Sequence, residues 1–339
     1  MRQEFKGLRS FAISAISMAG IITGVTFANA AELKVAHFMP ATHPMDKGVM
    51  TPLAEQLNEA TNGELTIRIF PSGELGKGPA QQYKRVVTGV ADIVFGIPEY
   101  TPKRFSKTAM VHLPGLFPGG EAATNALWDN IDLLADEYEK TKLLGLWANN
   151  PSVLITRDRA VRTVADMQGM KIRTPNPVMA DLVKAWGGIP VSMPTIDTYN
   201  AMNTGVIDAV MIGPSGIRSY KLNETAKYVT TNIPSALDSF YLLMNKSSWE
   251  NLSDEHKAAL DGLTGRELSL RGAKSFFEAG QAGLKLAQET GLELIEIDAE
   301  ADKEFRTQMQ KALDAFVANV GSEKNIDASA LVDALAGKS

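Results

Sequence analysis

Short apolar runs alternate with segments of helical periodicity along most of this chain, and this alternation constrains its fold more than any other feature. Apolar runs typical of strands occupy residues 33–38, 65–70, 91–96, 143–147, 153–156, 170–173, 189–191, 208–212 and 239–244. Helical patterns lie between them, at residues 45–60, 81–89, 121–140, 178–186 and 195–204. A β-α-β order of this kind predicts an α/β fold with mostly parallel sheets and helices on both faces.

One helical pattern is much longer than the others. Residues 253–290 contain no proline, and Ser253 is a suitable N-cap followed by two acidic residues. Large apolar residues recur every seven positions, at Leu263, Leu270, Phe277 and Leu284. Several glycines weaken the pattern. A continuous helix here would be about 55 Å long, so it would run across two domains.

The N-terminus has the features of a secretory signal peptide. Arg2, Lys6 and Arg9 precede an apolar run over residues 11–27, and the small-residue pattern Ala28-Asn29-Ala30 follows. The alternative is an uncleaved anchor helix, but the run is short and interrupted by polar residues. We therefore expect residues 1–30 to be removed and the exported chain to begin at Ala31, with no membrane span of its own.

Composition excludes several classes of protein. The length of 339 residues allows about two domains. The chain has no cysteine, which excludes disulfides, thiolate catalysis and cysteine-bound metals. A net charge of −5 argues against a nucleic-acid partner, since such proteins neutralise phosphates with basic patches.

The common motifs of catalysis, metal binding and cofactor binding are missing. The sequence contains no GxSxG, HExxH or GxxxxGK[ST], and Gly76-Lys77-Gly78 lacks the third glycine of a dinucleotide loop. His37, His43 and Asp46 match no known metal-ligand spacing, so a helix-entry loop is the better interpretation. We expect neither a metal nor a cofactor, and nothing in the sequence supports an enzyme.

Several segments, in order, resemble the solute-binding receptors of tripartite ATP-independent periplasmic (TRAP) transporters. The segment ADMQGMKIRTP at 165–175 is similar to the family pattern D-[LM]-x-G-[LM]-K-[IL]-R-x-P. Four further matches follow the family order: FPSGELG at 70–76, VTGVADIVF at 87–95, TYNAMNTGVID at 198–208, and the region 242–257. Together they cover nearly the whole exported chain.

The resemblance implies a two-lobed periplasmic binding protein fold with mixed sheets flanked by helices, crossing hinge strands and a long helix spanning both lobes. On this basis we expect residues 31–150 with about 240–275 in one lobe. The other lobe would hold 151–239 with about 276–325, and 326–339 would form a C-terminal helix or tail. The implied function is capture of a small organic acid in the periplasm and its delivery to the membrane subunits of a TRAP transporter. The mechanism would be closure of the lobes around strand 239–244.

Arg173 is the strongest candidate for ligand binding. It ends a predicted strand just before Thr174-Pro175, and ligands in α/β folds sit beyond the carboxyl ends of strands. A guanidinium presents a planar fork of donors that matches a carboxylate. In the family the arginine of this motif holds the ligand carboxylate, so the resemblance assigns that role to Arg173.

Departures from the family pattern suggest an apolar pocket. Many relatives carry a carboxylate-binding asparagine near the position of Ile212, and sugar-acid receptors have a glutamate in the region where Ile97 and Glu99 stand here. Further candidates for ligand contact lie at strand ends or loop starts: Phe38, Tyr100, Trp147, Tyr199, Asn149 and Asn176. Arg104 is a weak second cation. We expect a monocarboxylate with an aromatic or branched 2-oxo body rather than a diacid or sugar acid.

Three other functions remain open from the sequence. A receptor for an ATP-driven transporter shares a similar fold but lacks the helix that spans both lobes. A ligand-presenting partner of a sensor kinase would be encoded away from transporter membrane subunits. A periplasmic enzyme would show turnover of a bound acid, or a pair of carboxylates converging in the cleft.

Overall fold

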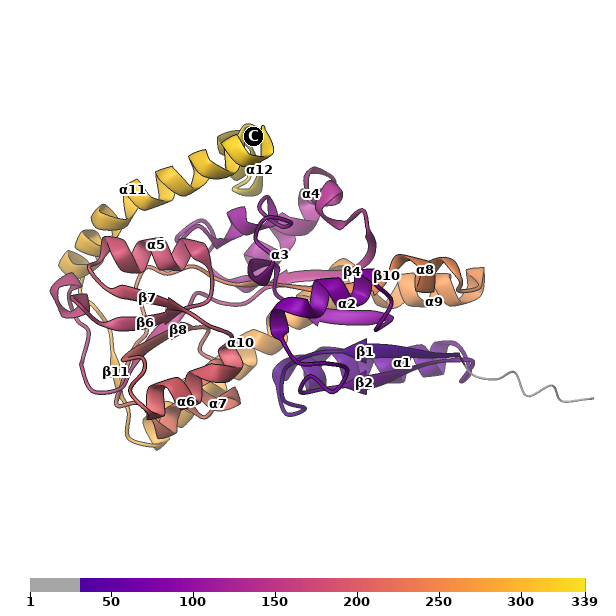
Figure 1. Cartoon of the computed structure of the whole chain (residues 1–339), viewed down its shortest axis with the longest axis horizontal. Coiled ribbons are helices and arrows are strands. Elements are labelled where there is room, and N and C mark those ends of the chain that lie inside the picture. The colour runs from indigo at the N-terminus through magenta and orange to yellow at the C-terminus, as the bar shows by residue number, and fades with distance from the viewer. Residues whose placement is uncertain (1–30, 339) are drawn as a thin grey trace, which may run out of the picture.

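The computed structural model describes residues 31–338 and arranges them as two β-sheets, each flanked by helices (Figure 1). The expected signal peptide, residues 1–30, lies outside the described residues. We call the elements around the first sheet the first lobe and those around the second sheet the second lobe.

The first sheet has five strands in the order β2-β1-β3-β10-β4. Their bounds are β1 (Ala31–Ala36), β2 (Leu65–Phe70), β3 (Ile93–Gly96), β4 (Thr141–Ala148) and β10 (Ser239–Asn245). Strand β1 is parallel to β2 and β3, whereas β10 is antiparallel to β3 and β4. The late strand β10 therefore returns to the middle of a sheet built mainly from the first part of the chain.

The second sheet has six strands in the order β11-β9-β5-β8-β6-β7. Their bounds are β5 (Val153–Thr156), β6 (Lys171–Thr174), β7 (Ile189–Ser192), β8 (Ala209–Ile212), β9 (Tyr228–Thr230) and β11 (Glu293–Ile295). Strand β5 runs antiparallel to both of its neighbours, β8 and β9. Both sheets are thus mixed, as the resemblance implies, rather than mostly parallel.

Helices cover the faces of both sheets. Their bounds are α1 (Thr51–Ala60), α2 (Gln82–Val87), α3 (Gly120–Asp129), α4 (Ile131–Tyr138), α5 (Pro177–Ala185), α6 (Thr198–Asn203), α7 (Gly216–Ser219), α8 (Lys246–Glu250), α9 (Asp254–Leu263), α10 (Arg266–Glu289), α11 (Ala299–Lys324) and α12 (Ala328–Leu335). Two expected helices differ in detail. The pattern at 121–140 is divided at Asn130 into α3 and α4, and a π-helical turn at Asp46–Met50 precedes α1.

The long pattern at 253–290 forms two helices instead of one rod. Ser253 caps α9 as expected, since its hydroxyl accepts a hydrogen bond from the His256 amide at 3.2 Å. The chain then breaks at Gly265, whose φ of +80° suits glycine. The Gly265 amide donates to the Leu144 carbonyl of β4 at 2.7 Å, so a tertiary hydrogen bond holds the break in place.

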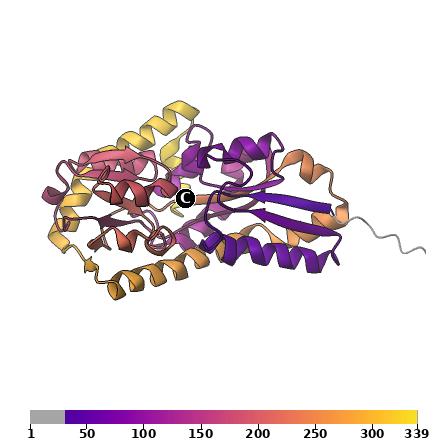
Figure 2. The ribbon, with the colours of Figure 1, turned by 60° about the horizontal axis from the view of Figure 1, so that its bottom comes forward.

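Helix α10 packs against both lobes. It contacts α3 and β4 of the first lobe, and α7 and β11 of the second (Figure 2). Glycines allow the close approach: a Cβ on Gly272 would lie 2.9 Å from the Trp147 ring, and one on Gly283 would lie 2.3 Å from the Pro214 carbonyl oxygen. The glycines that weaken the helical pattern therefore serve its packing.

A second helix also reaches from one lobe to the other. Phe305 and Met309 of α11 pack in the core of the second lobe, against α5. Val320, near the end of α11, packs with Leu331 and Leu335 of α12 in a core cluster of the first lobe. Figure 1 shows α11 and α12 passing along one side of the molecule, from the second lobe to the first.

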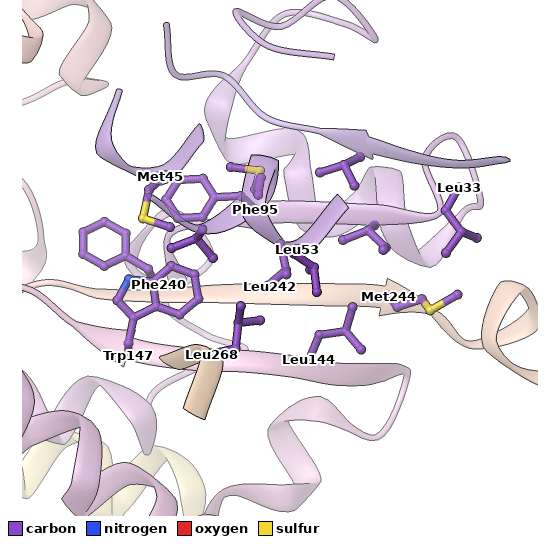
Figure 3. Close-up of a cluster of buried hydrophobic side chains, with 14 of the residues drawn as sticks. Leu33, Met45, Leu53, Phe95, Leu144, Trp147, Phe240, Leu242, Met244 and Leu268 are labelled. Carbon is purple, nitrogen blue, oxygen red and sulfur yellow. The ribbon is translucent and has the colours of Figure 1, made fainter. Parts of the chain in front are cut away.

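Aromatic side chains fill the first lobe between its sheet and α10. Phe240 stacks on Phe95 with ring centroids 5.7 Å apart, and Trp147 lies 6.2 Å from Phe240 (Figure 3). Phe240 also stacks on Phe276 of α10 at 4.5 Å. Because Phe240 and Phe276 border the space between the lobes, this stack connects the core to the site described next.

Candidate functional site

A small cavity lies between the two lobes, and side chains from both lobes line it. The first lobe lines it with apolar and aromatic side chains: Met39, His43, Ile97, Tyr100, Phe240 and Phe276. The second lobe contributes Arg173 and Thr195 with several residues that follow β8. Ile97 follows β3, Arg173 lies in β6 and Thr195 follows β7, so ends of parallel strands from both sheets meet here.

Arg173 is buried, with 1% of its surface exposed, yet no carboxylate lies within 4 Å of it among residues 31–338. Its Nε donates to the Met193 carbonyl at 3.1 Å, Nη1 to the Met211 carbonyl at 3.2 Å and Nη2 to Thr195 Oγ1 at 3.0 Å. A guanidinium has five N–H groups, so one remains on each terminal nitrogen. These two are free to bind a ligand carboxylate, which would neutralise a charge that is costly to bury alone.

Two chain segments cross between the lobes beside Arg173 and hydrogen-bond to each other. The Asn149 amide donates to the Asp238 carbonyl at 3.0 Å, and the Asp238 amide donates to Asn149 Oδ1 at 2.7 Å. The Ser152 amide donates to the Ala236 carbonyl at 2.9 Å. These contacts place the Asn149 and Asp238 side chains at the base of the cavity.

Asp238 is a buried carboxylate in the cavity lining. Asn176 Nδ2 donates to its Oδ1 at 3.2 Å, and Asn149 Nδ2 approaches its Oδ2 at 3.5 Å. Burial, followed by the nearby charge of Glu99, raises the pKa of Asp238 to about 6, although His112 and Arg173 oppose the shift. Asp238 therefore remains mostly ionised at pH 7.

A buried ion pair supports the base of the cavity. Glu99 Oε1 lies 2.5 Å from His112 Nε2 and accepts the Ser239 amide at 3.1 Å. Burial alone would lower the pKa of His112, but the adjacent Glu99, and Asp238 beyond it, raise it overall. Glu99 is thus paired with His112 and does not line the cavity.

His43 presents a neutral ring to the cavity. Its Nδ1 accepts the Met45 amide at 3.3 Å, so the ring hydrogen is on Nε2. Burial, aided by the charge of His37, lowers the pKa of His43 to about 3. The His43 and Phe276 rings pack edge to face with their centroids 5.7 Å apart, and both line the cavity. We call His43, Phe276 and Phe240, which stacks on Phe276, the aromatic wall. His37 instead pairs with Asp46, at 3.1 Å.

Hydrogen bonds join the lobes across the cavity mouth. Tyr100 Oη of the first lobe lies 3.2 Å from Thr195 Oγ1 of the second and accepts the Thr195 amide at 3.3 Å. Tyr220 of the second lobe donates its hydroxyl to Met39 Sδ of the first. Thr195 therefore hydrogen-bonds both to Tyr100 of the first lobe and to the Arg173 guanidinium.

The structure brings half of the predicted site residues to the cavity. Arg173, Tyr100, Asn149 and Ile212 line it. Asn176 lies just behind, where its Oδ1 caps α5 by accepting the Met179 amide at 2.8 Å.

Three predicted aromatic contacts lie elsewhere. Phe38 and Trp147 belong to the buried core of the first lobe, where the ring of each lies 6.0 Å from the ring of Phe95. Tyr199 is on α6 and bonds Glu224 at 3.0 Å. Arg104 bonds the Asp136 carbonyl at 2.8 Å, away from the cavity.

Several cavity residues escaped sequence reasoning. His43 was weighed as a metal ligand and assigned instead to a helix-entry loop as a solvated side chain, whereas it is buried. Asp238, Thr195 and Phe276 were not singled out. Asp238 carried one detectable signal, since it is an isolated acid inside an apolar stretch that leads into β10. The other residues reach the cavity only through the tertiary fold.

The sequence profile of the bacterial extracellular solute-binding protein family 7 matches residues 35–319. The chain belongs to this family, whose members serve TRAP transporters. It is 27% identical over 263 residues to the 2,3-diketo-L-gulonate-binding periplasmic protein YiaO of Escherichia coli, which covers 75% of each chain. The family is one of periplasmic solute receptors, and within residues 31–338 no helix has the length and hydropathy needed to cross a membrane.

Two solved structures have nearly the same fold. One is a TRAP solute-binding protein from a marine metagenome, specific for aromatic acids and bound to metahydroxyphenylacetate. It is 28% identical, with a TM-score of 0.87 over 91% of this chain and 98% of that one. The other, from Rhodoferax ferrireducens, holds benzoate and is 25% identical, with a TM-score of 0.87 over 91% and 97%. The two-lobed fold and the function of a TRAP receptor for small organic acids, both expected from the sequence, are confirmed. The homologues are solute-binding receptors rather than enzymes.

Proposed function

We propose that this receptor binds an aromatic monocarboxylate in the periplasm, delivers it to the membrane subunits of a TRAP transporter and leaves it chemically unchanged. The observation that carries the proposal is a buried guanidinium with two free N–H groups in a cavity that aromatic side chains also line. A planar acid satisfies both features, because its carboxylate pairs with Arg173 and its ring packs on the wall.

The charges of the cavity favour one carboxylate over two. Among the described residues that line it, Arg173 is the one cation, while His43 is neutral and Asp238 is acidic. A second ligand carboxylate would be buried without a partner and close to Asp238, which costs several kcal/mol. Ile97 and Ile212 also offer no hydrogen bonds to the hydroxyls of a sugar acid.

The aromatic wall favours a ring over a branched aliphatic body. Phe276 and His43 form an edge-to-face pair, and Phe276 stacks on Phe240. Aromatic contacts of this kind contribute about 0.5–1.5 kcal/mol beyond the burial of apolar area. Both solved structures reported above hold aromatic acids, which supports the same choice.

A thermal-shift and calorimetry series tests the proposal. Benzoate, phenylacetate and phenylpyruvate would be compared with 4-methyl-2-oxopentanoate, succinate and galacturonate under identical conditions. We expect the aromatic acids to bind tightest, with a ligand at 100 times its Kd stabilising the protein by about 2.7 kcal/mol. Succinate or galacturonate binding more than tenfold tighter than every aromatic acid would contradict the proposal.

Export and delivery have separate tests. N-terminal analysis of the exported protein should give Ala31 as its first residue. Reconstituted membrane subunits should take up the labelled acid only when this receptor is present, and NMR should recover the bound acid unaltered.

A further inference from the structure

Asp238 is the one acid among the described residues that line the cavity, and the proposed function leaves it without a role. We infer that Asp238 accepts a hydrogen bond from a hydroxyl or amino group on the ring of the ligand, so that the receptor selects donor-bearing aromatic monocarboxylates. This inference rests on the proposed function and narrows its ligand class.

The hydrogen bonds of Asp238 leave part of its capacity unused. A carboxylate offers about four acceptor positions. Asn176 fills one at 3.2 Å, and Asn149 approaches a second at the 3.5 Å limit of a hydrogen bond. No Lys, Arg or His nitrogen among residues 31–338 forms an ion pair with Asp238 within 4 Å. The remaining positions are therefore available to a group inside the cavity.

The charged groups around Asp238 favour a donor there. Arg173 and His112 lower the pKa of Asp238, whereas Glu99, which is paired with His112, raises it. The ring of His43 is neutral. Once a ligand carboxylate pairs with Arg173, that cation no longer offsets the charge of Asp238 as well. A ligand hydroxyl would then stabilise the ionised carboxylate by a charge-assisted hydrogen bond, which is shorter and stronger than a neutral one.

An unsubstituted ring would leave this acceptor unsatisfied. Closing the cavity over benzoate would place the free oxygen positions of Asp238 against apolar atoms, and an unmade hydrogen bond to a buried charged group is costly. Sites built to bind a hydroxyl discriminate strongly against analogues that lack it. We expect a preference of at least tenfold.

The test compares each hydroxybenzoate isomer with the fluorobenzoate of the same substitution, since fluorine is close in size to hydroxyl but donates no hydrogen bond. Calorimetry at pH 8 should show at least one hydroxy isomer binding ten times more tightly than its fluoro counterpart. In Asp238→Asn that preference should fall below threefold, whereas the exposed control Asp132→Asn should keep it.

Equal binding of all three isomer pairs to the wild type would overturn the inference, as would a preference that persists in Asp238→Asn. A second measurement avoids dependence on that variant: the wild-type preference should shrink between pH 8 and pH 5 as Asp238 gains a proton. A preference unchanged at pH 5 would also overturn it.

If benzoates bind well but without regard to hydroxyl groups, only this inference fails. If no aromatic acid binds and a diacid or sugar acid does, the proposed function fails with it.

Discussion

The two sides of the cavity, one from each lobe, differ in chemistry. The second lobe contributes the guanidinium of Arg173, which hydrogen bonds to two backbone carbonyls and a threonine hydroxyl hold in position. The first lobe contributes a stack of rings that continues the core, from Phe95 through Phe240 to Phe276. One side can thus recognise charge while the other recognises shape, and a ligand must satisfy both for the lobes to close on it.

Removing the guanidinium is expected to have the largest effect. Arg173→Ala should weaken benzoate binding by about 2–5 kcal/mol, because the ligand carboxylate would be buried without a partner. Arg173→Lys should recover only part of this, since an ammonium cannot reproduce the planar fork. The exposed Arg218→Ala is the matched control and should bind normally. If calorimetry shows that Arg173→Ala binds benzoate with wild-type affinity, Arg173 does not bind the ligand carboxylate.

Asp238 should make the free energy of unfolding depend on pH. Burial raises the pKa of Asp238 from 3.8 to about 6, so between these values the folded state holds a proton that the unfolded state has lost. The free energy of unfolding should therefore fall as pH rises through this window, by at most about 3 kcal/mol.

Urea denaturation at pH 4, 5, 6 and 7 measures this dependence. The Asp238→Asn variant lacks this titrating group. The difference in the free energy of unfolding between wild type and variant should therefore change between pH 4 and pH 6. Parallel profiles for wild type and variant would show that Asp238 titrates normally.

Changing the aromatic wall should have a smaller and more selective effect. Phe276→Leu keeps an apolar side chain but removes the ring, so benzoate should bind about 0.5–1.5 kcal/mol more weakly. Phe277→Leu is a close control, because Phe277 is the next residue on the same helix and is 49% exposed. Equal losses in both variants would point to a general effect on α10 rather than on the wall.

The contact across the cavity mouth should have an effect no larger than that of the aromatic wall. Tyr100→Phe removes a hydroxyl that bonds Thr195 twice, which should cost about 0.5–1.5 kcal/mol in ligand affinity. Small-angle scattering should show closure on ligand in both proteins, with a larger mean radius of gyration for the ligand-free variant. Identical ligand-free profiles would mean that this contact does not hold the lobes together.

Much of the fold could be predicted because its elements have strong local patterns. The strands at 65–70 and 153–156 were predicted at their observed residues, since apolar runs there are bounded by turn residues. Strands β9 and β11, of three residues each, were missed because they are stabilised by pairing with distant strands. The break at Gly265 also depends on a distant partner, the Leu144 carbonyl.

The site was less predictable for the same reason. Arg173 was found through a contiguous motif, but aromatic residues at strand ends gave no signal to separate core from cavity. Trp147 and Tyr100 both follow that pattern, yet only Tyr100 lines the cavity. Asp238 acquires its significance from Asn149 and Asn176, which are 89 and 62 residues away in sequence.

The central claim is that Arg173 holds the ligand carboxylate while the aromatic wall holds its ring. Calorimetry of benzoate and benzamide with wild type and Arg173→Ala tests it directly, because the two ligands share a ring and differ in charge. We expect benzoate to bind the wild type at least 30-fold tighter than benzamide, which corresponds to about 2 kcal/mol, and this advantage to vanish in Arg173→Ala. An advantage of the same size in both proteins would contradict the claim, since the carboxylate would then be bound elsewhere.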